Sequence, residues 1–196
     1  MKKNFFIYIV LFLCYKANAQ QFLNKINFVQ EDIQHSITTE NTSLALKKLP
    51  FSLMFENTFY NTKKELLNAL KVAVIDNVND LQNIEEGMPI HLIPYFENGS
   101  GFSADENGLY SSVIVNSYGH HYLLYENEDN KSIELVSKKG TIGTFKWDVH
   151  RFYINEKDYP IENIPNQTLY FVFLTDFNNN NIIDTDELRI VKVSFK

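Results

Sequence analysis

Residues 168–195 contain Thr168-Leu-Tyr-Phe-Val-Phe-Leu-Thr175, then Asp176-Phe-Asn-Asn-Asn-Asn-Ile-Ile-Asp-Thr-Asp-Glu187, and finally Val191-Lys-Val-Ser-Phe195. The first of these runs is rich in β-branched and aromatic residues, and the last alternates apolar with polar residues. Both patterns are typical of β-strands. The polar run between them is therefore predicted to be a loop that joins two strands.

Oxygen-bearing side chains recur through this loop at the spacing that calcium ligation requires. They occupy positions one, three, five, nine and twelve, and the hydrophobe Ile183 occupies position eight. Calcium takes six to eight oxygen ligands, of which position seven supplies a backbone carbonyl and a glutamate at position twelve supplies two carboxylate oxygens. The predicted ligands of one Ca²⁺ are Asp176, Asn178, Asn180, the carbonyl of Ile182, Asp184 and Glu187.

The twelve residues resemble the EF-hand-like calcium loops of the DxDxDG type, and the resemblance covers no other part of the chain. Two features depart from that pattern. Position six holds Asn181 where glycine is usual, although Asn tolerates the left-handed backbone conformation best after glycine. The flanking segments are strands rather than helices. The alternative is an Asn-rich turn that binds no metal, since Asn and Asp also favour turns for local hydrogen-bonding reasons.

The rest of the chain predicts a mainly β, antiparallel β-sandwich or jelly-roll-like domain over residues 20–196, with one short α-helix. Short strands separated by turns about every ten residues favour that fold class. Further strands are expected at Asn24–Val29, Phe51–Phe55, Ile90–Phe96, Leu109–Asn116, His121–Tyr125, Ile133–Val136, Gly140–Trp147, Phe152–Asn155 and Tyr159–Ile161.

The helix is expected near Lys63–Ile75. Thr62 and Glu65 form a capping box, and Leu66, Leu67, Leu70 and Val74 follow at helical spacing. The segment Lys71-Val-Ala-Val-Ile75 fits a strand equally well, so the end of the helix stays open. The polar stretch Asn77–Gly87 is the one candidate linker, and we expect a single domain.

Residues 1–19 have the organisation of a secretory signal peptide. Lys2 and Lys3 precede the apolar run Phe5–Leu13, and Ala17-Asn18-Ala19 is a small-x-small cleavage site. Cleavage there places the protein in the periplasm, at the cell surface or outside the cell. It also removes Cys14, the single cysteine, whose lipidation is disfavoured because Leu13, which is not small, precedes it.

Charge and aromatic content limit the classes of partner. The segment 1–19 carries three of the 18 basic residues and none of the 24 acidic ones, so the mature chain has a net charge of −9. Such a charge argues against nucleic acid as a partner, and no transmembrane segment is expected after cleavage. Tyr118, Tyr122 and Trp147 are candidates for a sugar-stacking platform, with cross-strand packing as the alternative.

These features predict an exported, non-catalytic β-sandwich module with a structural calcium site that binds a glycan or an envelope protein. No catalytic nucleophile or metal triad stands out in the sequence. The alternative is a small secreted hydrolase acting on glycans, whose two carboxylates a sequence alone does not pair.

We predict that export removes residues 1–19. N-terminal sequencing of the exported protein should then begin at Gln20, since the basic, apolar and small-x-small parts of the segment occur in the order that signal peptidase requires. A lipid-modified product that begins at Cys14 would contradict this and would place the protein on a membrane leaflet.

Overall fold

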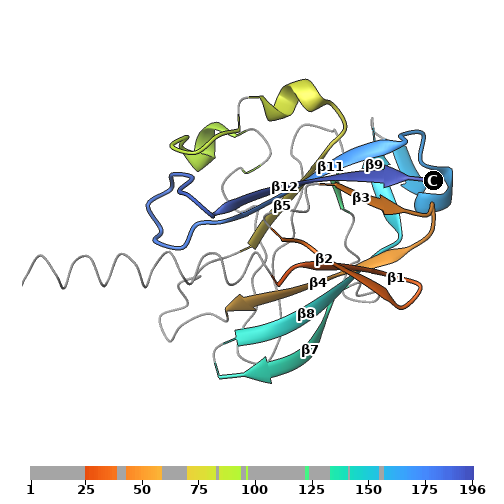
Figure 1. Ribbon diagram of the computed structural model, residues 1–196, viewed down its shortest axis with the longest axis horizontal. Helices are drawn as coiled ribbons and strands as arrows, with labels where there is room; N and C mark the ends of the chain where they lie inside the picture. Colours follow the sequence, from red (N-terminus) through yellow and green to blue (C-terminus); the bar gives the residue numbers. More distant parts are fainter. Residues whose placement is uncertain are drawn as a thin grey trace, which may run out of the picture.

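A computed structural model describes residues 25–38, 43–58, 70–82, 84–93, 96, 122–123, 133–140, 142–154 and 157–196. The predicted signal peptide, the strand expected at Leu109–Asn116 and most of the expected helix lie outside these ranges. Within them the chain is mainly β, with three sheets and short 3₁₀ turns, which confirms the predicted fold class. Two of the sheets form the layers seen in Figure 1.

The five-stranded sheet has the order β2-β1-β4-β8-β7 and is antiparallel throughout. The four-stranded sheet has the order β3-β12-β11-β5, in which the β12–β3 pair is parallel. A three-stranded sheet, β10-β9-β6, completes the set. The strands are β1 (Asn27–Gln30), β2 (Ile33–Ser36), β3 (Ser43–Leu46), β4 (Phe51–Thr58), β5 (Leu70–Ile75), β6 (Tyr122–Leu123), β7 (Ile133–Lys139), β8 (Ile142–Val149), β9 (Arg151–Ile154), β10 (Lys157–Pro160), β11 (Thr168–Thr175) and β12 (Leu188–Phe195).

The main hydrophobic core lies between the five-stranded and four-stranded sheets. Phe28 of β1 meets Phe171 and Phe173 of β11 edge-on, with ring centroids 5.2 and 6.1 Å apart. Phe51 of β4 packs on Phe171 and on Phe195, the latter from β12. All five rings are buried. Edge-to-face aromatic pairs of this kind add to the free energy gained from burial, and they join the two sheets into a sandwich.

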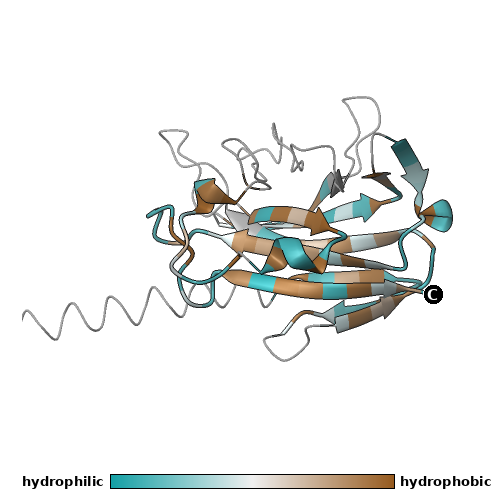
Figure 2. Cartoon of the chain, turned by 90° about the horizontal axis from the view of Figure 1, so that it is seen from above, coloured by the Kyte–Doolittle hydropathy of each residue, from teal (hydrophilic) through white to brown (hydrophobic). Residues whose placement is uncertain are grey.

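A second hydrophobic cluster covers the outer face of the four-stranded sheet. Val172 and Leu174 of β11 point to this face and are fully buried. The segment 78–93 covers them, through η1 (Val78–Leu81), η2 (Ile90–Leu92) and the buried side chain of Ile84. Strands β5 and β11 therefore have nearly continuous apolar sequences, whereas β12 alternates apolar with polar residues. Long hydrophobic stretches are visible in Figure 2.

This covering explains where the sequence-based prediction of the helix was wrong. Residues Leu70–Ile75 form β5, a strand that pairs with β11, and not the end of a helix. Val72 and Val74 face the main core, while Ala73 and Ile75 face the second cluster. A six-residue segment that is buried on both faces has no periodicity that separates strand from helix.

Other boundaries also differ from the prediction. Ile90–Leu92 forms a 3₁₀ turn after Pro89 instead of opening a strand. The first strand, expected at Asn24–Val29, is β1 at Asn27–Gln30, and it lies between β2 and β4 in the sheet. The expected linker Asn77–Gly87 is part of the cover of the four-stranded sheet. No helix in the described ranges is long and apolar enough to cross a membrane.

We predict that Phe28→Ala lowers the free energy of unfolding by about 3–5 kcal/mol, because it opens a cavity at the contact between the two sheets. Thermal denaturation should show a melting temperature lower by at least about 6 °C. Gln34→Ala, on the neighbouring strand β2 and exposed, is the control and should melt within about 2 °C of the wild type. Equal melting of both variants would contradict a shared core.

Candidate metal centre

The loop Asp176–Glu187 joins β11 to β12, as the sequence predicts. The backbone N–H of Thr175 donates to the carbonyl of Glu187 at 3.0 Å and closes the base of the loop. In Figure 1 the loop projects from the end of the hairpin opposite the C-terminus of the chain. The framework that holds it is rigid, because β11 is buried on both faces.

Three residues of the loop have left-handed backbone conformations. They are Asn179 with φ 55°, Asn181 with φ 60° and Asp186 with φ 70°. Asn and Asp adopt this region at lower cost than other non-glycine residues. Asn181 thus makes the turn at position six for which a calcium loop usually has glycine.

The first half of the loop is wrapped around side-chain oxygens. Asp176 Oδ1 accepts the N–H of Asn180 at 3.1 Å, and Asp176 Oδ2 accepts the N–H of Asn181 at 2.9 Å. Asn178 Oδ1 also accepts the N–H of Asn180, at 3.0 Å, and Asn180 Oδ1 accepts the N–H of Ile182 at 2.7 Å. These bonds turn four consecutive ligand positions toward one side of the loop.

The side chains at positions three, five and nine meet at a single oxygen atom. Asn178 Nδ2 donates to Asp184 Oδ2 at 2.6 Å, and Asn180 Nδ2 donates to the same oxygen at 2.9 Å. The three side chains therefore lie within hydrogen-bonding distance of one another at the surface of the loop. Rotation of either amide about its Cβ–Cγ bond would present an oxygen in place of the N–H group.

Glu187 closes the loop from its far end and is 2% exposed. Its Oε1 accepts the N–H of Phe177 at 2.7 Å, and its Oε2 accepts the N–H of Asp184 at 3.0 Å. Burial raises the pKa of this carboxyl above its ordinary value, the two hydrogen bonds oppose that rise, and the negative charges of Asp176 and Asp184 add to it. The loop thus contains a buried carboxylate whose charge is incompletely compensated.

The carbonyl of Ile182 is oriented by a neighbouring segment. Ile182 forms an isolated antiparallel bridge with Pro89. On either side of the bridge, the N–H of Ile90 donates to the carbonyl of Asn181, and the N–H of Ile183 donates to the carbonyl of Met88, both at 2.9 Å. In such a pair the peptide groups of the bridged residue point away from the partner strand. The N–H of Ile182 accordingly bonds Asn180 Oδ1 in the loop, and its carbonyl lies on the same side.

A cationic side chain lies near the first position of the loop. Lys71, on β5 opposite Leu174, has a pKa lowered by burial, and the carboxylate of Asp176 partly reverses that change. Arg189 Nη2 lies 3.5 Å from Asp186 Oδ1 at position eleven. Both cations balance acidic charge in a loop that carries four carboxylates within twelve residues.

The donor set fits a hard, oxygen-loving cation. It comprises three carboxylates, two amides and one carbonyl, all from one loop. Among the described residues, no group of three or more His, Cys, Asp and Glu side chains is arranged to hold a metal ion. A site here would need the amide and carbonyl oxygens as well, a composition that suits Ca²⁺ and not a transition metal.

The predicted sugar-stacking platform is only partly described. Trp147 on β8 is fully buried in the main core, with a neighbour in Phe145 of the same cluster. Its ring packs in the core and has no exposed face for a sugar. The prediction that Trp147 binds a ligand is therefore wrong. Tyr118 lies outside the described residues, and only the backbone of Tyr122, in β6, is described. The large exposed hydrophobic residues in the described ranges are all aliphatic.

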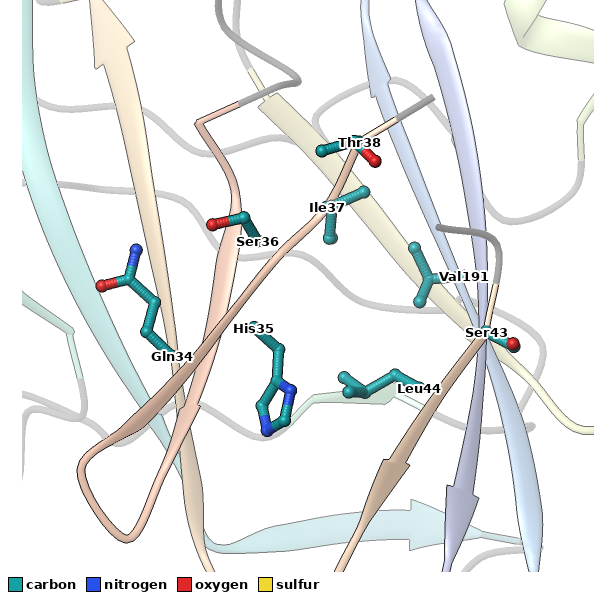
Figure 3. A pocket seen from close by; sticks show the side chains of 8 residues that line it. All are labelled: Gln34, His35, Ser36, Ile37, Thr38, Ser43, Leu44 and Val191. Carbon is teal, nitrogen blue, oxygen red and sulfur yellow. The ribbon is translucent and has the colours of Figure 1, made fainter. Parts of the chain in front are cut away.

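A pocket of about 340 Å³ opens between β2 and the β3 edge of the four-stranded sheet (Figure 3). His35 is the one titratable side chain among its described lining, and its ring lies beside Leu44. A second pocket of about 340 Å³ contains one carboxylate, Glu56, which is bound to Lys25 Nζ at 2.6 Å. Neither pocket presents the pair of carboxylates that glycoside hydrolysis requires.

Comparison with protein-family models, with curated proteins and with solved structures found no match to the chain. The residues of the loop are therefore the basis on which a function is assigned. The six candidate ligand positions in the loop remain a prediction from the sequence. No feature of the sequence predicts the bridge between Ile182 and Pro89, because nothing in residues 87–90 resembles a metal-binding motif.

We predict that the buried carboxylate of Glu187 gives the metal-free protein a stability that falls as pH rises. The ordinary pKa of this carboxyl is 4.5, and its pKa in the folded state is higher. At a pH between these two values, the folded protein keeps a proton that the unfolded chain has lost. The free energy of unfolding then declines with pH by at most about 1.4 kcal/mol per pH unit. Chemical denaturation from pH 4 to 7 should show this slope in the wild type and not in Glu187→Gln. A wild-type stability that rises relative to the variant would contradict it.

Proposed function

We propose that the protein is an exported, non-catalytic β-sandwich module whose β11–β12 loop binds one structural calcium ion. The observation that carries the proposal is the convergence of the loop groups. Asn178 and Asn180 both donate to Asp184 Oδ2, and Glu187 reaches back to accept the N–H groups of Phe177 and Asp184. The bridge to Pro89 directs the peptide groups of Ile182 away from residues 87–90 and toward the loop side chains.

The charges of the site favour a divalent cation. Three carboxylates, from Asp176, Asp184 and Glu187, repel one another, and this repulsion contributes to the raised pKa of Glu187. A Ca²⁺ ion would neutralise most of that charge while replacing hydrogen bonds with metal–oxygen contacts. The role of the ion would be to hold the ends of β11 and β12 together, since both strands enter the loop directly.

The described surface supports a binding module more than a glycan hydrolase. Neither of the two pockets described above contains paired carboxylates, and Trp147 is in the core. The partner of such a module would be a glycan or an envelope protein, and the large exposed hydrophobic side chains that the structure describes are aliphatic.

We predict that calcium stabilises the folded protein. Only three of the five ligand side chains are charged, so the dissociation constant should lie in the range of about 10⁻⁴ to 10⁻³ M found in extracellular modules. At tenfold that concentration, the gain is about 1.4 kcal/mol, a rise in melting temperature of about 3–6 °C. Glu187→Gln should lose most of this rise. Magnesium should do much less, because it demands a tight octahedral shell.

The matched control for this measurement is Asp186→Asn. It removes one carboxylate from the same loop at a position that does not provide a ligand, and Asn accepts the φ of 70° found there. Asp186→Asn should retain the calcium response that Glu187→Gln loses. A wild-type melting curve that does not move in 10 mM calcium, or equal losses in the two variants, would show that the loop is an Asn-rich turn.

A further inference from the structure

The segment Ile84–Ile93, here termed the strap, lies across the outer face of the four-stranded sheet and ends beside the loop. Its side chains Ile84, Ile90 and Ile93 are buried in the same cluster as Ile183 of the loop, which is 1% exposed. Position eight of the loop is thus part of a hydrophobic core that the strap completes.

Three backbone hydrogen bonds join the strap to the loop. The N–H of Gly87 donates to the carbonyl of Ile183 at 2.7 Å, and the N–H of Ile183 donates back to Met88 at 2.9 Å. The N–H of Ile90 donates to the carbonyl of Asn181 at 2.9 Å. The strap therefore fixes the peptide groups on both sides of Ile182, the residue that offers a backbone oxygen to the proposed calcium ion.

We propose that calcium binding and docking of the strap are thermodynamically coupled, so that the strap is a calcium-stabilised latch. This inference rests on the calcium site proposed above. The ion requires the carbonyl of Ile182 to point into the loop, and the strap requires residues 181–183 to be extended beside it. Whichever binds first orders the backbone that the other needs, so each lowers the entropy cost of the other.

The strap has the features of a segment that opens locally. It contains a 3₁₀ turn and irregular backbone instead of a strand, and it turns at Gly87 with φ 87°. Leu92 within it is 55% exposed. Segments with few regular hydrogen bonds open at a lower free energy than central strands. Without calcium, the strap would open more often and expose the apolar outer face of β11, including Val172 and Leu174.

Amide hydrogen exchange on the full mature chain tests the latch directly. The amides of Gly87, Ile90 and Ile183 should exchange at least about fivefold more slowly in 10 mM calcium chloride than in chelator. Two reference amides lie away from the loop: Ile37, bonded to Ile26 at 3.0 Å, and Lys196, bonded to Leu46 at 2.9 Å. Their exchange should change by less than about twofold.

A pair of glycine variants tests the reciprocal effect. Gly87→Ala strains the strap, because φ 87° disfavours a Cβ although no atom lies within 4 Å of it. Gly140→Ala, in the β7–β8 turn at φ 61° and equally open, imposes similar strain in the other sheet. Calcium titration by calorimetry should show an affinity weakened about fivefold in Gly87→Ala and unchanged in Gly140→Ala.

The outcomes separate this inference from the calcium site itself. If calcium raises the melting temperature but leaves the strap amides and the affinity of Gly87→Ala unchanged, the latch is wrong and the calcium site stands. If calcium binds to none of these proteins, the proposed function fails and the latch fails with it. Slower strap exchange together with the loss of affinity in Gly87→Ala alone supports the coupling.

Discussion

The structure depends on covering both faces of β11. Phe171 and Phe173 require the five-stranded sheet on one side, and Val172 and Leu174 require a second cover on the other. Leaving either pair in water would forfeit about 1.5–3 kcal/mol for each side chain, a large part of the stability of a domain this size. The sandwich supplies the first cover. The segment 78–93, which contains little regular structure, supplies the second.

This second cover also decides the shape of the loop after β11. The buried side chain of Ile183 anchors the middle of the loop to the outer cluster, while the base is closed by the bond between Thr175 and Glu187. Between these two fixed points the chain must turn sharply, and Asn179 and Asn181 do so with positive φ. The conformation of the loop is therefore a consequence of how the sheet is covered as well as of the loop sequence.

The parts of the fold that the sequence predicted are those with local causes. The strand Thr168–Thr175, the loop and the strand around Val191–Phe195 were predicted because composition, turn chemistry and ligand spacing agree within 28 residues. For Lys71–Ile75 the sequence left helix and strand open, because burial on both faces removes the periodicity that identifies a strand. Trp147 was a candidate ligand residue because a sequence does not show which side of a strand faces the core. The pairing of Ile182 with Pro89 joins residues far apart in the chain, and no local pattern records it.

The hydrogen bonds inside the loop also explain why any calcium affinity should be modest. In the described conformation Asn178 and Asn180 present N–H groups to Asp184, which satisfies that carboxylate without a cation. To bind calcium, both amides must rotate, which breaks their hydrogen bonds to Asp184. The rotation also breaks the bonds that Asn178 Oδ1 and Asn180 Oδ1 accept from the N–H groups of Asn180 and Ile182. Each lost bond costs about 0.5–1.5 kcal/mol. The free energy needed to break these hydrogen bonds lowers the net free energy of calcium binding.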